Sequence, residues 1–215
     1  MTRLISRIAV ATATVLMLLA PALWNGFPLL QYDTGGYLAR WFEGTLEESR
    51  STVYGLFLNL LTWPDFWPAI VVQAMLTVWV LALVLRAHGL GGRPAILLLV
   101  VGALSIFTTL PWIVSILLTD VFAGLAVLAL YLVMLRADAL RGWEYIALLV
   151  LIAFAAATHS ATLLVLVALL GAGLLIALYD RHLVPLSRLA QGLGALVLGA
   201  VMLVAANVAV SGRIA

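Results

Sequence analysis

Three ionisable side chains stand out in a chain that has few of them: Asp33, Asp120 and His159. Asp33 follows the first apolar segment, Asp120 precedes an apolar run that ends at Arg136, and His159 precedes another apolar run. A carboxylate or an imidazole can act as a general base or acid on a reacting hydroxyl group. Because an ionisable side chain at membrane depth costs free energy, each of the three is a candidate functional residue.

The spacing along the predicted helices places two of these residues at similar heights. The sixteen residues from Asp120 to Arg136 rise about 24 Å, and the fifteen from Glu144 to His159 rise about 22 Å, at 1.5 Å per residue. Both side chains are therefore expected near the outer surface of a membrane, in one layer with Asp33. The structural alternatives are a helix-end acid for Asp120, a headgroup-facing loop residue for His159 and an Asx-capped turn at Asp33.

Two outer arginines, Arg40 and Arg50, are candidate substrate-binding residues, as is Tyr37. A guanidinium group can hold a phosphate through two hydrogen bonds, which would suit a phospholipid-linked substrate. The alternative is that both arginines pair with nearby acids, namely Glu43, Glu47 and Glu48.

Several other residues have structural interpretations. Asp65 is interpreted as the N-cap of the second membrane span. Close helix packing is expected along the small-residue stretches Gly192 to Ala195, which includes Gly194, and Gly199 to Ala200. Interhelical hydrogen bonds are expected from Gln73, Gln191 and Asn207.

The composition determines the class of element that must position these residues. The 215 residues are 66% hydrophobic and 9% charged, with a net charge of +2, whereas soluble domains contain roughly 25% charged residues. This excludes a soluble cytosolic enzyme and a nucleic-acid-binding protein. The absence of cysteine excludes a disulfide framework, a thiolate nucleophile and a cysteine-ligated metal.

The apolar runs predict an all-α fold, a polytopic bundle of about seven transmembrane helices, because a helix satisfies its own backbone in lipid. Residues 1–215 form a single membrane domain in this interpretation, with a first outer loop at about 25–65 that contains a short interfacial helix at 52–62. The spans are expected at about 8–24, 66–85, 94–110, 115–135, 143–158, 161–179 and 189–210.

The distribution of arginine predicts the orientation in the cell (inner or plasma) membrane. With a cytoplasmic N-terminus, eight of the eleven arginines lie inside, and six of the nine acids lie outside. The first span also has features of a signal peptide, with Ala20-Pro21-Ala22 as a cleavage site, and either interpretation leaves residue 25 onward outside.

Several short motifs, in this order, resemble membrane glycosyltransferases of the GT-C fold, in particular protein O-mannosyltransferases and the lipid A aminoarabinose transferase. They are an acid opening a short helix, an interfacial helix, a basic glycine-rich turn, a Thr-Asp start to the fourth span and a polar pair before an aliphatic span. The matching segments are Tyr32 to Arg40, Ser51 to Asn59, Leu85 to Arg93, Thr119 to Leu125 and His159 to Leu164.

The resemblance implies transfer of a sugar from a polyprenyl-phosphate donor to an acceptor at the outer membrane face. Asp33 would be the general base, Asp120 would orient the site, and Arg40 or His159 would hold the leaving phosphate. The sequence requires no cofactor and leaves a divalent metal open, although Thr34 stands where the family often has a second acid.

Family members continue beyond a seventh span, so the chain resembles the shared seven-helix module alone, as in a truncated or partner-dependent form. The alternative function is a non-catalytic multi-pass subunit or transporter component, with the bilayer and a membrane protein as partners. No nucleic acid is expected as a partner.

Overall fold

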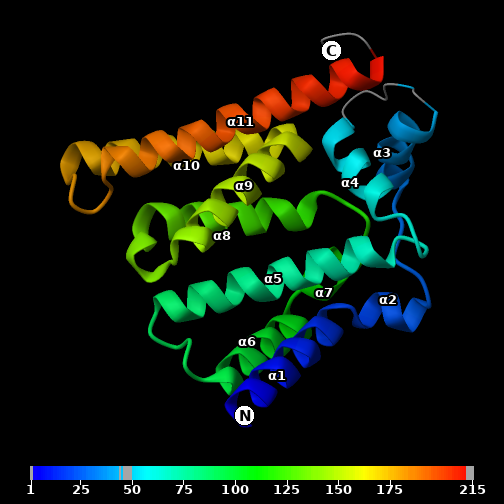
Figure 1. Ribbon diagram of the computed structural model, residues 1–215, viewed down its shortest axis with the longest axis horizontal. Helices are drawn as coiled ribbons and strands as arrows, with labels where there is room; N and C mark the ends of the chain where they lie inside the picture. The colour runs from blue at the N-terminus through cyan, green and yellow to red at the C-terminus, as the bar shows by residue number, and fades with distance from the viewer. Residues whose placement is uncertain (1, 44, 46–49, 212–215) are drawn as a thin grey trace. The chain divides into compact units, whose positions relative to one another are not determined.

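The computed structural model describes residues 2–43, 45 and 50–211, without the side chains of Thr2, Arg3, Arg40 and Ser211. Within these residues the chain is all-α, with eleven α-helices and one short 3₁₀ helix, η1 (Ala137–Ala139) (Figure 1). The α-helices are α1 (Thr2–Leu18), α2 (Ala20–Asn25), α3 (Tyr32–Phe42), α4 (Thr52–Leu60), α5 (Trp67–Ala87), α6 (Pro94–Phe107), α7 (Leu110–Ser115), α8 (Asp120–Leu135), α9 (Gly142–Thr158), α10 (Ser160–Tyr179) and α11 (Leu186–Ser211).

Three of these helices, α5, α10 and α11, are long and apolar enough to cross a membrane. This indicates a membrane protein, as the composition predicts. Four shorter apolar helices, α1, α6, α8 and α9, occupy the other predicted spans. An 18-residue helix rises about 27 Å, so these shorter helices fall below the usual hydrocarbon thickness of about 30 Å. The all-α prediction is confirmed, while seven complete spans stay a prediction.

The chain divides into two compact units. The first comprises Met1–Thr34 and Leu60–Val121, and the second comprises Gly35–Asn59 and Phe122–Ala215. In the first unit α1 packs against α5, α6 and α7. Gln73 of α5 is fully buried there, and its side-chain amide donates to the carbonyl oxygens of Val114 and Ile116, at 3.0 and 3.1 Å. The predicted interhelical role of Gln73 is therefore confirmed.

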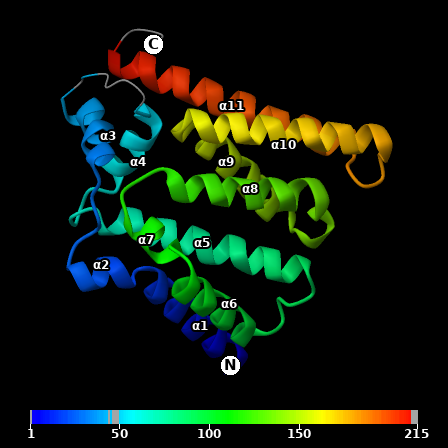
Figure 2. The ribbon, with the colours of Figure 1, turned by 180° about the vertical axis from the view of Figure 1, so that it is seen from behind.

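In the second unit α11 packs against both α9 and α10, which both ribbon views show (Figure 2). Gly199 lies so close to α9 that a Cβ atom built on it would be 2.5 Å from the Ala153 carbonyl oxygen. A Cβ atom on Gly192 would be 2.9 Å from a methyl carbon of Leu170, whereas Gly194 has open space. Close helix packing is thus confirmed at two of the three predicted glycines.

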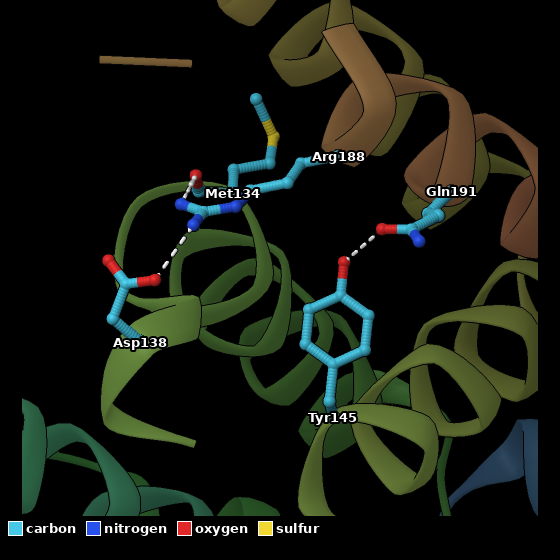
Figure 3. A network of polar contacts seen from close by, with 5 residues as sticks. All are labelled: Met134, Asp138, Tyr145, Arg188 and Gln191. Carbon is cyan, nitrogen blue, oxygen red and sulfur yellow. Dashed lines mark hydrogen bonds and ion pairs between the residues drawn. The ribbon is translucent and has the colours of Figure 1, made fainter. Parts of the chain in front are cut away.

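The other two predicted interhelical hydrogen bonds are also present in the second unit. The Thr52 hydroxyl group donates to the Asn207 amide oxygen. The Tyr145 hydroxyl group donates to the Gln191 amide oxygen (Figure 3). Near the same pair, Arg188 donates to the Met134 carbonyl oxygen and pairs with the Asp138 carboxylate at 3.0 Å. These contacts join the start of α11 to the α8–α9 connection.

Three local predictions differ from the structure. The predicted first span, 8–24, is divided between α1 and α2, which are separated at Leu19. The predicted fourth span, 115–135, is interrupted: α7 ends at Ser115, and α8 begins only at Asp120. The interpretation of Asp65 as an N-cap is wrong, because Phe66 holds the N-cap position of α5 without a side-chain hydrogen bond. Asp65 instead precedes the N-cap residue and has left-handed backbone geometry, with φ of 47°.

Candidate functional site

Two distant segments run side by side in the first unit, and each leads into a helix with an acid in its first turn. The Leu29 backbone N–H donates to the Ser115 carbonyl oxygen at 2.9 Å, and the Leu117 N–H donates to the Leu29 carbonyl oxygen at 3.0 Å. These bonds form an isolated parallel bridge between Leu29 and Ile116. The non-helical residues between α7 and α8 are therefore ordered, because Leu29, in the segment that precedes α3, supplies hydrogen-bond partners for their backbone.

The buried Thr34 side chain extends this pairing by one hydrogen bond. Its hydroxyl group donates to the Leu117 carbonyl oxygen at 3.1 Å and accepts a bond from the Gln31 N–H at 3.0 Å. Thr34 is 2% exposed, so both bonds are shielded from solvent. The first turn of α3 is thereby attached to the segment that leads into α8.

Asp33 and Asp120 are placed by this pairing at the beginnings of their helices. Asp33 precedes the bonded Thr34 and lies in the first turn of α3, where it is half-buried. Asp120 follows the bonded Leu117 by three residues and is the exposed first residue of α8. The positive end of a helix dipole stabilises a carboxylate at both positions. The structure thus brings the two predicted catalytic acids to neighbouring helix starts, and their catalytic roles stay predictions.

The predicted substrate-binding residues belong to the second unit. Tyr37 is 3% exposed, and its ring meets Tyr54 edge to face at a centroid distance of 4.9 Å. Tyr54 in turn contacts Phe57 and Phe122. The Tyr37 ring is therefore part of an aromatic core, and its contact with a substrate stays a prediction.

Arg50 and His159 are each close in sequence to a residue of one long-range hydrogen bond in the second unit. The Ser51 hydroxyl group donates to the Ala157 carbonyl oxygen at 2.8 Å. Arg50 precedes Ser51 in the chain, and His159 follows Ala157 by two residues. The structure thus brings these two basic candidates to the same end of α9.

Glycine permits the placement of the Arg50 side chain. A Cβ atom on Gly36 would lie 2.8 Å from the Arg50 Cγ atom, so a larger residue in α3 would displace the arginine. Both Arg50 and His159 are half-buried, and His159 stands in extended backbone between α9 and α10. Arg40 belongs to α3, but its side chain lies outside the described residues, as do Glu47 and Glu48.

Sequence reasoning missed the two hydroxyl groups that position the candidates, those of Thr34 and Ser51. Both are buried and bond to carbonyl oxygens far along the chain. Ser51 directly precedes α4, a position where a Ser or Thr side chain commonly caps a helix, and it accepts a bond from the Tyr54 N–H. The capping pattern was therefore visible in the sequence, but the long-range partners were not.

Replacing Thr34 by valine tests the attachment of α3 to the segment before α8. The change preserves the side-chain shape but removes a donor and an acceptor, so we expect the unfolding free energy to fall by about 1–3 kcal/mol. Hydrogen–deuterium exchange should rise in peptides covering 29–34 and 115–120. Thr34→Ser keeps the hydroxyl group and is the matched control. Equal exchange in the two variants would contradict the role assigned to this hydroxyl.

A metal centre would need several ligating side chains close together. No group of three or more His, Asp or Glu side chains within the described ranges comes together in a way that could hold a metal ion. Asp33 and Asp120 supply two carboxylates at most, and the position after Asp33 is occupied by Thr34, whose hydroxyl group is engaged with Leu117. The described residues therefore offer no assembled metal centre.

Comparison with known proteins does not assign the chain to a family. No protein-family model, curated protein or solved structure matches it. Any function assigned to the chain therefore depends on the chemistry and placement of its own residues and on the short motifs that resemble GT-C enzymes.

Proposed function

We propose that the protein is a membrane glycosyltransferase that transfers a sugar from a polyprenyl-phosphate donor to an acceptor hydroxyl group. The observation that carries this proposal is the hydrogen bonding of Leu29 and Thr34 to residues 115–117, which lie just before α8. It brings the segments that carry Asp33 and Asp120 together at the starts of α3 and α8. The long apolar helices support it as well, because a donor with a polyprenyl tail remains in the bilayer during the reaction.

In the proposed reaction the Asp33 carboxylate accepts the proton of the acceptor hydroxyl group. The acceptor oxygen then forms a bond to the anomeric carbon, and the bond from that carbon to the phosphate oxygen breaks. The electron pair leaves with polyprenyl phosphate. Asp120 orients the acceptor. Binding of the phosphate by the basic side chains Arg50 and His159, which belong to the second unit, stays a prediction from the sequence. Asp33 is half-buried, which restricts competing water more than an exposed carboxylate would.

The decisive experiment measures sugar transfer from a short-chain polyprenyl-phosphate sugar by the full chain reconstituted in lipid vesicles. We expect Asp33→Asn to lower the rate about 10²- to 10⁴-fold, because an amide cannot accept the proton. Binding of the donor should persist in this variant. A wild-type rate in folded Asp33→Asn protein would show that Asp33 is not the base.

The matched control is Asp65→Asn, which makes the same chemical change at an exposed acid. Asp65 has a φ of 47°, and asparagine tolerates the left-handed region well, so this variant should fold normally. Its transfer rate should equal that of the wild type.

The second candidate is a non-catalytic multi-pass subunit, favoured by the low burial of two membrane-length helices. Only 22% of the apolar window in each of α10 and α11 is buried, against 44% in α5. A subunit would neither bind nor be stabilised by the lipid-linked sugar, and it would co-purify with a larger membrane protein. Binding of the donor without such a partner favours the enzyme.

A further inference from the structure

A groove of about 350 Å³ lies between α10 and α11 in the second unit. Its lining is apolar, with the buried side chains of Leu170 and Leu196 as the floor. The exposed side chains of Leu174 and Leu193 form part of the rim, at 46% and 57% exposure. The groove is therefore open at the exposed surface of α10 and α11, two helices that are long enough to cross a membrane.

Small residues keep the groove open. Gly171 of α10 and Ala190 of α11 both line it and are exposed. A Cβ atom on Gly171 would meet nothing within 4 Å, in contrast to Gly173, where it would collide with Met134. Met134 belongs to α8, and the same added atom would lie 3.1 Å from a methyl carbon of Leu189 in α11. α10 is thus closely packed at Gly173 and has open space at Gly171.

The depth of the groove corresponds to the distal part of a lipid chain. Leu174 lies five residues before Tyr179, the last residue of α10, so the groove begins about 8 Å from that helix end. From Leu174 to Val167 it extends about 10 Å further. One leaflet of the hydrocarbon core is about 15 Å thick. Tyr179 is 93% exposed, as is typical of an aromatic residue at the membrane interface.

The charges at this end of the second unit complement an anionic headgroup. Arg181 and His182 are exposed in the α10–α11 connection, where the Asp180 carboxylate accepts a bond from the His182 backbone N–H. Arg188 is already paired with Asp138 (Figure 3). The charged groups assigned to this end comprise four arginines against three acids, namely Arg136, Arg141, Arg181, Arg188, Asp138, Glu144 and Asp180.

We propose that the α10–α11 groove holds one acyl chain of an anionic phospholipid, whose phosphate is bound by Arg181. An acyl chain matches the narrow apolar lining, and the arginine selects the headgroup charge. The site shares no residue with those assigned to sugar transfer, and it needs no catalytic activity of the chain.

The test uses the full chain reconstituted in phosphatidylcholine vesicles. The probes are phosphatidylglycerol and phosphatidylcholine, each spin-labelled near the end of one acyl chain, and electron paramagnetic resonance measures the motionally restricted fraction. We expect the wild type to restrict phosphatidylglycerol more than phosphatidylcholine. Gly171→Leu, which fills the groove, should abolish this difference, and Arg181→Gln should reduce it.

Gly194→Leu is the matched control, because Gly194 is exposed on α11, does not line the groove and would have no neighbour within 4 Å of an added Cβ atom. This variant should still restrict phosphatidylglycerol more than phosphatidylcholine, as the wild type does. Ala190→Leu fills the groove from the other helix and replaces Gly171→Leu if that variant does not fold. Retention of the difference in a folded groove-filling variant would overturn the proposal.

A second copy of the chain is the competing occupant. Because the chain has no cysteine, Leu174→Cys introduces a single thiol at the rim. Under oxidising conditions in vesicles this variant should stay monomeric on a non-reducing gel if a lipid fills the groove. Efficient formation of a disulfide-linked dimer would overturn the lipid proposal in favour of an interface between copies.

Discussion

Gly199→Leu is expected to lower the unfolding free energy by about 3 kcal/mol or more, at or above the upper end of the range typical of overpacked cores. The reason is the close approach of α11 to α9, where a Cβ atom would lie 2.5 Å from the Ala153 carbonyl oxygen and 3.0 Å from the Ala156 Cβ atom. The first of these neighbours is backbone, so it cannot rotate away. Relief requires α9 and α11 to separate, which would expose the other contacts of their interface.

The measurement is reversible unfolding of the detergent-solubilised protein by sodium dodecyl sulfate, followed by circular dichroism. Gly194→Leu makes the same chemical change five residues earlier in α11, where the space is open, and should change stability little. Gly199→Ala should give an intermediate loss, because it introduces the clashing Cβ atom without the rest of the leucine side chain. If Gly199→Leu and Gly194→Leu unfold at the same detergent fraction, the assigned α9–α11 packing is wrong.

Gln73→Leu is expected to lower the unfolding free energy of the first unit by about 1–3 kcal/mol. The fully buried amide donates to the carbonyl oxygens of Val114 and Ile116, at the end of α7 and just beyond it. Leucine has similar volume but no donor, and leaving a buried carbonyl without its partner costs about 1–3 kcal/mol. Ile116 retains a bond from the Leu118 N–H, so most of the loss arises at Val114.

The Gln73 variant should also loosen the segment that leads to Asp120. Hydrogen–deuterium exchange should increase in peptides covering 114–120, together with a lower unfolding midpoint. Gln191→Leu is the control, because Gln191 is exposed and water can replace it as the partner of the Tyr145 hydroxyl group. Gln191→Leu should lower the unfolding free energy by less than about 1 kcal/mol. Equal losses in the two variants would show that burial of Gln73 does not matter.

The hydropathy pattern was sufficient to predict the all-α class and most helix positions. Apolar runs near residues 66–85, 161–179 and 189–210 correspond to α5, α10 and α11, since backbone groups in lipid must be paired within the segment. The polar residues within such runs, such as Gln73 and Asn207, were predicted to bond between helices for the same reason, and they do. Length and hydropathy are local properties, so they can be read directly from the chain.

The break between α7 and α8 could not be predicted in this way. Residues 116–119 are as apolar as their neighbours, apart from Thr119, and the hydropathy pattern joined them to a continuous span. They are not helical because Leu29 and Thr34, more than eighty residues earlier, form hydrogen bonds with this segment through backbone and side-chain groups. Such a competition between helical and long-range hydrogen bonds depends on which segments meet in space.

The sequence by itself determined that this is an apolar, helical, cysteine-free chain with few charges. The physical reason is that backbone N–H and C=O groups in lipid must find their hydrogen-bond partners within the same segment, which favours helices. The sequence also singled out Asp33, Asp120 and His159 as residues that cost free energy in such surroundings. Only the tertiary structure decided that the segments carrying Asp33 and Asp120 are hydrogen-bonded to each other near the starts of α3 and α8, and that the Tyr37 ring is core. The reason is that hydrogen bonds and aromatic contacts between distant segments depend on three-dimensional proximity, which no local pattern encodes.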